Sequence, residues 1–167
     1  DLSQAIVVIT SAPGEGLGDR NLRYHPKLAY NVLARVPLTI YIPAAAATTV
    51  DTPVSLMDLR PTLAHMTTRR FSPAWEGESL LEALDQPDWR RKTPILISEL
   101  YQQAVLWEGS KLIFDRFSHT VELYDLAKDP HERVSLVEER GEDVSGLLLL
   151  LKANRNYLEP SGRAVER

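Results

Sequence analysis

Short apolar segments rich in β-branched residues follow one another closely over residues 93–126. They read TPILISEL, QAVLWEGSKLIFD and HTVELYDL, and the second contains Glu108-Gly109, a dipeptide that predicts a hairpin turn. Connections this tight leave no room for the crossover helix that joins parallel strands. The pattern therefore predicts an antiparallel sheet, with strands over roughly 94–99, 103–107, 110–115 and 120–125.

The N-terminal half has another organisation, in which apolar runs alternate with helical segments. QAIVVIT (4–10) and VPLTIYIP (36–43) are continuous apolar runs, which predict buried strands of a mostly parallel sheet. Residues 11–24 between them are a glycine-rich loop. With few strands of its own, this half is expected to expose an apolar edge or face that invites association.

Helices are predicted where apolar residues recur at helical spacing. Ser55 and Asp58, three residues apart, form a capping-box pattern that marks a helix start. A closing helical segment is expected to be interrupted near Gly141 and Gly146. The predicted helices cover 26–35, 55–66, 78–85 and 138–155. The expected domains are 1–90, an α/β core portion; 91–160, an antiparallel α+β subdomain; and 161–167, a disordered tail.

Composition excludes several classes of protein. The chain has 167 residues, no cysteine and a net charge of −4, so thiolate metal sites, cysteine nucleophiles and a basic nucleic-acid surface are not expected. No stretch approaches the roughly 20 apolar residues of a membrane span. The chain begins with Asp1 and enters a strand almost at once, so we expect it to be part of a longer protein.

The stretch IVVITSAPGEGLGD (6–19) first suggests a nucleotide-binding loop, because Gly14, Gly16 and Gly18 follow a strand. The dinucleotide motif G-x-G-x-x-G fails, since Asp19 stands at its sixth position. The phosphate-binding P-loop fails as well, because no Gly-Lys-Ser/Thr follows. The remaining explanation of these glycines is conformational: they let the backbone turn sharply after the strand.

Motifs along nearly all of residues 4–158 resemble the C-terminal part of sulfatases of the alkaline phosphatase superfamily. They appear in the family's order, and LYDLAKDPHE (123–132) is the most specific of them. The others are ITSAPGEGLGDR, ARVPLTIYIP, VSLMDLRPTL and GESLLEAL. The resemblance implies a partial alkaline-phosphatase-like α/β/α sandwich, followed by a small antiparallel sheet with a packed helix.

The resemblance also implies a metal-binding loop whose ligands have been replaced. The family's loop reads Thr-Ser-Asp-His-Gly-Glu or carries Asn for His, and its Asp and His or Asn bind a divalent cation, Ca²⁺ or Mg²⁺. Here Ala12 stands in the Asp position and Pro13 in the His position, whereas the flanking residues match. Neither side chain can ligate a cation, so no metal site and no cofactor are expected in this chain.

Some polar positions of the family remain. His25 stands where many members have a histidine that contacts the transferred group, and Lys27 lies where others place a basic residue. Both are candidate substrate contacts. Arg20 takes a position that is often histidine and is expected to be a solvated charge. His65 and His131 are expected to serve packing or turns rather than to bind ligands.

These observations favour a sulfatase-type hydrolase region that is inactive as this chain, because the family's nucleophile and other metal ligands lie in the N-terminal half. One alternative is a non-catalytic binding or scaffold domain that reuses the fold. Another is part of an active hydrolase whose catalytic groups lie upstream. The expected partners are the missing N-terminal half or a second copy of the chain, and a sulfated or phosphorylated ligand.

Overall fold

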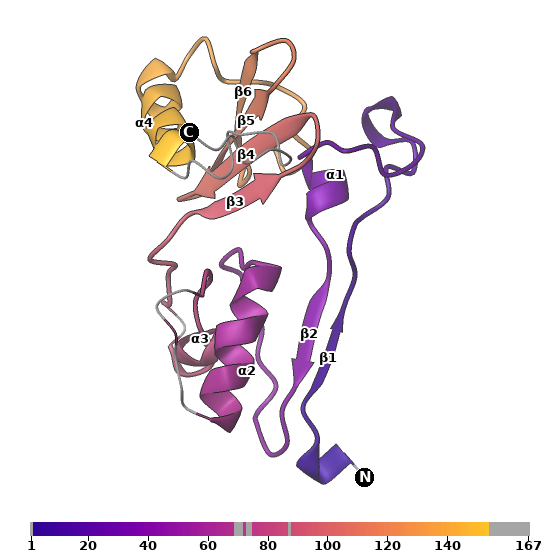
Figure 1. Ribbon diagram of the computed structural model, residues 1–167, viewed down its shortest axis with the longest axis vertical. Coiled ribbons are helices and arrows are strands. Elements are labelled where there is room, and N and C mark those ends of the chain that lie inside the picture. The colour runs from indigo at the N-terminus through magenta and orange to yellow at the C-terminus, as the bar shows by residue number, and fades with distance from the viewer. Residues whose placement is uncertain (1, 69–71, 73–74, 87, 154–167) are drawn as a thin grey trace, which may run out of the picture. The chain divides into compact units, whose positions relative to one another are not determined.

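The computed structural model describes residues 2–68, 72, 75–86 and 88–153 (Figure 1). The chain separates into two compact units, one of Ala44–Ile95 and one that combines Asp1–Pro43 with Leu96–Arg167. The fold is mixed α/β, as predicted. The division into domains 1–90 and 91–160 stays a prediction, and the tail 161–167 lies outside the described residues.

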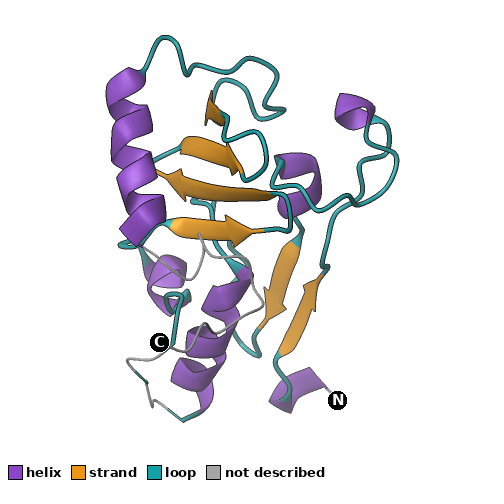
Figure 2. Ribbon diagram, turned by 45° about the horizontal axis from the view of Figure 1, so that its top comes forward, coloured by secondary structure: helices purple, strands orange, loops and turns teal. Residues whose placement is uncertain are grey.

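A four-stranded antiparallel sheet forms the centre of the larger unit, and it confirms the prediction for residues 93–126 (Figure 2). Its strands lie in chain order: β3 (Ile95–Ser98), β4 (Gln102–Trp107), β5 (Ser110–Asp115) and β6 (Val121–Asp125). Glu108 and Gly109 have φ values of 49° and 79°, and Trp107 pairs with Ser110 across them. Positive φ at both central residues is typical of the tight hairpin turn that these residues predict.

Helix α4 (Gly141–Ala153) packs against one face of this sheet (Figure 2). Leu147 and Leu151 are buried in a cluster with Val105, Leu112 and Leu123 from the strands. Each such side chain contributes roughly 1.5–3 kcal/mol when it is removed from water. The helix continues through Gly146, so the predicted interruption there is wrong. The predicted end at residue 155 lies outside the described residues.

Strands β1 (Val7–Thr10) and β2 (Leu38–Tyr41) form a separate two-stranded sheet. They pair antiparallel, with Thr10 opposite Leu38, so the expectation of parallel strands is wrong. The reason is local: the chain leaves β1 at one end and returns to β2 at that same end. The intervening helix α1 (Asn31–Ala34) is also much shorter than the predicted 26–35.

This two-stranded sheet exposes apolar side chains, as predicted. Ile9 is 64% exposed and Tyr41 is 43% exposed. An isolated pair of strands is marginally stable in water. That the pair associates with another chain or segment stays a prediction.

The smaller unit contains helices α2 (Leu59–Thr67) and α3 (Leu81–Asp85). A short 3₁₀ turn, Leu56–Asp58, leads into α2, and Ser55 caps it as the sequence predicts. Asp58 completes the capping box by accepting a hydrogen bond from the Ser55 N–H at 2.7 Å.

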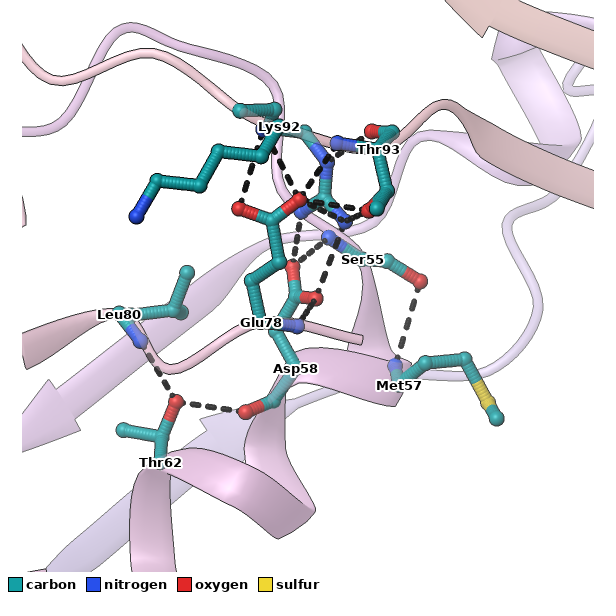
Figure 3. A network of polar contacts seen from close by, with 9 residues as sticks. Ser55, Met57, Asp58, Thr62, Glu78, Leu80, Lys92 and Thr93 are labelled. Carbon is teal, nitrogen blue, oxygen red and sulfur yellow. Dashed lines mark hydrogen bonds and ion pairs between the residues drawn. The ribbon is translucent and has the colours of Figure 1, made fainter. Parts of the chain in front are cut away.

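Asp58 is fully buried and organises a network of polar contacts (Figure 3). Its carboxylate accepts hydrogen bonds from the Glu78 N–H at 2.8 Å and from Arg91 Nη1 at 2.5 Å. Thr62 donates to the Asp58 carbonyl oxygen and accepts from the Leu80 N–H. The DLRPTL motif (58–63) therefore serves to hold this unit together.

Candidate functional site

The loop that follows β1 is shaped by close backbone contacts at its glycines. The Gly14 N–H donates to the Leu33 carbonyl oxygen at 2.8 Å, and a Cβ at Gly14 would lie 2.5 Å from the Val32 carbonyl oxygen. A Cβ at Gly16 would lie 2.4 Å from the Leu22 carbonyl oxygen. The backbone explanation of these glycines is confirmed, because no side chain fits at either position.

Ala12 and Pro13 lie exposed at the start of this loop. A methyl group and a pyrrolidine ring offer no lone pair to a cation. Among the described residues, no group of three or more His, Asp and Glu side chains could hold a metal ion. The donor set of this loop does not fit the several oxygen ligands that Ca²⁺ or Mg²⁺ requires.

His25 and Glu15 are brought together by the loop. His25 Nδ1 lies 2.7 Å from Glu15 Oε1, and both side chains are about half exposed. Because a carboxylate only accepts, the Nδ1 atom carries the proton. The other ring nitrogen, Nε2, has no hydrogen-bond partner among the residues that the structure describes. Glu15 thus orients an imidazole whose second nitrogen remains open to a ligand.

Lys27 lies two residues further along and is exposed. Its carbonyl oxygen accepts a hydrogen bond from the Tyr101 N–H at 3.3 Å. Its ammonium group forms no ion pair with a described residue. The segment with His25 and Lys27 is therefore attached to the connection between β3 and β4.

Arg20 is not the solvated charge that the sequence predicts. Its guanidinium carbon lies 3.8 Å from the centroid of the Tyr30 ring, and its Nη1 donates to the Glu132 carbonyl oxygen. Arg20 has a positive φ of 50°. The side chain therefore connects the loop to Tyr30 by a cation–π contact and to the C-terminal segment by a charge-assisted hydrogen bond.

A buried ion pair next to Arg20 was not predicted from the sequence. Lys111 Nζ and Glu132 Oε1 lie 2.7 Å apart, and both side chains are essentially inaccessible. Glu132 Oε2 accepts from the Asn31 N–H at 2.7 Å, and Lys111 Nζ donates to Asn31 Oδ1 at 2.9 Å. Burial lowers the pKa of the Lys111 ammonium group, and the Glu132 carboxylate opposes that shift. This network fixes the start of α1 to the sheet.

The LYDLAKDPHE motif (123–132) supplies Glu132 of this pair and the turn before it. Asp129 Oδ2 accepts hydrogen bonds from the N–H groups of Arg133 and Val134, so this side chain stabilises the turn. His131 is exposed, and its Nδ1 lies 3.4 Å from Asp19 Oδ2. The motif is thus a structural connection between the loop and the sheet.

A pocket of about 260 Å³ lies in the smaller unit, and neither candidate substrate contact lines it. His65, which was expected to serve packing, is part of its wall. His65 Nδ1 lies 3.0 Å from Ser79 Oγ. The charged groups at the wall are already paired, since Lys92 contacts Glu82 and Glu78 accepts from Thr93.

No helix of the described residues has both the length and the apolar character needed to cross a bilayer.

Comparison with known proteins identifies relatives of this arrangement. No family model matches the chain. The chain is 28% identical over 145 residues to the uncharacterized sulfatase YidJ of Escherichia coli K12. The aligned region covers 80% of this chain and 28% of YidJ.

Solved structures share the fold. The 2-O GAG sulfatase BT1596 matches with a TM-score of 0.77 and 22% identity over 90% of this chain and 36% of its own. The phosphonate monoester hydrolase of Agrobacterium radiobacter matches with a TM-score of 0.68 and 21% identity over the same shares. The chain thus spans about a third of the length of these proteins. The chain is therefore similar in sequence to one sulfatase and shares part of the alkaline-phosphatase-like fold of solved sulfatases.

Proposed function

We propose that this chain is the region of a sulfatase-type protein that contacts the sulfate or phosphate group of an ester through His25 and Lys27. On its own the chain holds no catalytic cation and does not hydrolyse the ester. The observation that carries the proposal is the 2.7 Å contact between His25 and Glu15.

The chemistry of this pair suits an anion. Nδ1–H donates to the carboxylate, and when the imidazole is protonated its Nε2–H is a second donor that Glu15 does not engage. A sulfate oxygen accepts that hydrogen bond, and the exposed Lys27 ammonium adds a second positive charge nearby. Charge-assisted hydrogen bonds of this kind are shorter and stronger than neutral ones.

The same loop explains why hydrolysis is not expected. Ester cleavage of this type needs charge stabilisation on the leaving and non-bridging oxygens, which a bound cation supplies. Ala12 and Pro13 provide no ligand for such a cation. We propose that the nucleophile and other ligands of a competent enzyme would have to come from a further segment, either in a longer chain or in a partner.

Calorimetric titration tests both halves of the proposal. Sodium sulfate is expected to bind the chain, and His25→Gln and Lys27→Met are each expected to weaken this binding at least severalfold. His131→Gln is the matched control, because it removes another exposed histidine with a carboxylate neighbour. Calcium chloride and magnesium chloride are expected to give no stoichiometric heat.

The outcomes separate the competing functions. Sulfate binding unaffected by His25→Gln and Lys27→Met would contradict the anion-contact role. Tight, stoichiometric calcium binding would contradict the loss of the cation site and favour an active hydrolase. Absence of any anion binding would favour a scaffold domain that reuses the fold.

A further inference from the structure

The loop after β1 folds back on itself, and the base of this fold carries Glu15 and His25. The Gly16 N–H donates to the Tyr24 carbonyl oxygen at 3.0 Å. Glu15 directly precedes Gly16, and His25 directly follows Tyr24. This backbone hydrogen bond therefore holds side by side the two arms of the loop from which the carboxylate and the imidazole meet.

The tip of this loop, residues 17–22, has an unfavourable backbone conformation. Leu17, Arg20 and Asn21 have φ values of 47°, 50° and 60°, which lie in the left-handed region that residues with a side chain seldom adopt. Each such residue costs conformational free energy and persists only where surrounding contacts hold it. The loop tip therefore depends on contacts from outside the loop to keep its shape.

The turn that follows β6 supplies such contacts. Arg133 Nη2 lies 2.6 Å from Asp19 Oδ1, and the Arg20 guanidinium donates to the Glu132 carbonyl oxygen. His131 Nδ1 lies 3.4 Å from Asp19 Oδ2, which is longer than a normal hydrogen bond. Arg133 thus makes the principal contact with the Asp19 carboxylate, whose side chain is only 22% exposed.

This turn is itself fixed to the four-stranded sheet. Asp129 Oδ2 accepts a hydrogen bond from the Arg133 N–H at 2.6 Å. The Glu132 side chain forms the buried ion pair with Lys111 of β5. A strained loop tip is therefore held by a turn that is anchored in the core, and the ion pair of Asp19 with Arg133 joins the two.

We propose that Asp19 and Arg133 are positioning residues for the anion contact. Their ion pair holds the loop in the conformation in which Glu15 orients His25. This inference rests on the proposed function and assigns control of that site to a contact outside the anion-binding residues. When the pair is broken, the loop tip relaxes, the two arms lose their pairing for part of the time, and the imidazole loses its orientation.

The sign of one substitution separates this role from a simple effect of charge. Asp19→Asn removes a negative charge, which by electrostatics alone strengthens the binding of an anion. Loss of the ion pair has the opposite effect, because the imidazole is then less well oriented. Arg133→Met weakens anion binding under both explanations, so Asp19→Asn decides between them.

The test measures sulfate affinity and loop order in the full chain. Sodium sulfate is titrated by calorimetry, and amide hydrogen exchange is followed by NMR. Asp19→Asn and Arg133→Met are each expected to weaken sulfate binding about two- to fivefold, the range that an exposed ion pair supports. The double variant should bind like either single variant, because the same pair is lost in all three. Arg133→Lys keeps the charge and should retain most of the affinity.

Hydrogen exchange reports on the loop independently of the anion. The Gly16 amide, which is bonded to Tyr24, should exchange faster in Asp19→Asn and Arg133→Met, whereas the amides of β4 and β5 should keep their protection. Lys128→Met is the matched control, because it removes a cation that is 85% exposed and belongs to the same segment. It should change neither sulfate affinity nor exchange at Gly16.

Unchanged or tighter sulfate binding in Asp19→Asn, with the sheet amides still protected, would overturn the inference. Asp19→Asn should also cause no further weakening in a His25→Gln background, and a further loss there would overturn action through the imidazole. If the wild-type chain binds no sulfate, the proposed function fails and exchange at Gly16 decides alone whether the pair holds the loop. Faster exchange in both variants would then support that hold, and unchanged exchange would overturn it.

Discussion

Lys111 Nζ and Glu132 Oε1 lie 2.7 Å apart, and neither side chain reaches solvent. One residue comes from strand β5 and the other from the turn after β6. Through Asn31, the same pair holds the beginning of α1. The segment that presents His25 and Lys27 is therefore attached to the C-terminal sheet by buried charges as well as by Arg20.

Removal of one partner of this pair should strongly destabilise the folded protein. Lys111→Met leaves the Glu132 carboxylate buried without its counter-charge, and we expect a loss of about 3–5 kcal/mol in the free energy of unfolding. Lys128→Met is the control, because Lys128 is 85% exposed and its pair with Asp125 lies at the surface. That control should lose no more than about 1 kcal/mol. Equal losses in the two variants, measured by urea unfolding, would show that burial of the pair does not matter.

Acidification should destabilise the smaller unit through Glu78. Burial would raise the pKa of Glu78, but hydrogen bonds from Thr93 and Lys92 and the charge of Arg91 lower it below its ordinary value of 4.5. A carboxyl group with a lowered folded-state pKa contributes stability above its unfolded pKa and loses it as the pH falls through the folded pKa. Urea unfolding measured from pH 7 downward should thus show a free energy of unfolding that declines below about pH 4.5.

Glu78→Gln should flatten this decline, whereas Glu82→Gln, which removes a half-exposed carboxylate from the same unit, should leave it in place. A decline of the same size in both variants would assign the acid sensitivity to other groups.

Gly16→Ala should disturb the loop that carries Glu15. The new Cβ would lie 2.4 Å from the Leu22 carbonyl oxygen, so backbone must move at a cost of about 1–3 kcal/mol. Gly146→Ala is the counterpart, because no atom lies within 4 Å of its Cβ position in α4. It should stabilise the protein by about 0.5–1 kcal/mol. Thermal unfolding measures both, and a neutral Gly16→Ala would contradict the close backbone approach.

The antiparallel sheet could be predicted because its signals are local: β-branched runs, short connections and Glu108-Gly109 at the turn. The capping box of Ser55 and Asp58 was predictable for the same reason. The direction of β2 against β1 was not, because nothing within either strand encodes how the intervening loop returns. Gly146 was taken as a helix interruption, but burial of Leu147 and Leu151 against the sheet offsets the weak helix propensity of one glycine.

The candidate site was predictable only where the family's motif could be matched. The Ala12 and Pro13 replacements and the position of His25 follow from that match. The contact of His25 with Glu15 joins residues ten positions apart, and the Lys111–Glu132 pair joins segments far apart in sequence. A lysine in an alternating strand is typical of a solvent-facing position, so only the three-dimensional structure revealed its burial.

The central claim is that this chain carries only part of a hydrolytic site, and one assay tests it most directly. Ala12→Asp and Pro13→His together restore the two residue types of the family's loop, and the purified double variant is assayed with chromogenic sulfate and phosphate esters in the presence of Ca²⁺ or Mg²⁺. Groups that act as a unit in catalysis are strongly non-additive, so two ligands without the nucleophile should produce no turnover above a metal-only blank. Turnover above that blank that disappears again on His25→Ala would contradict the account.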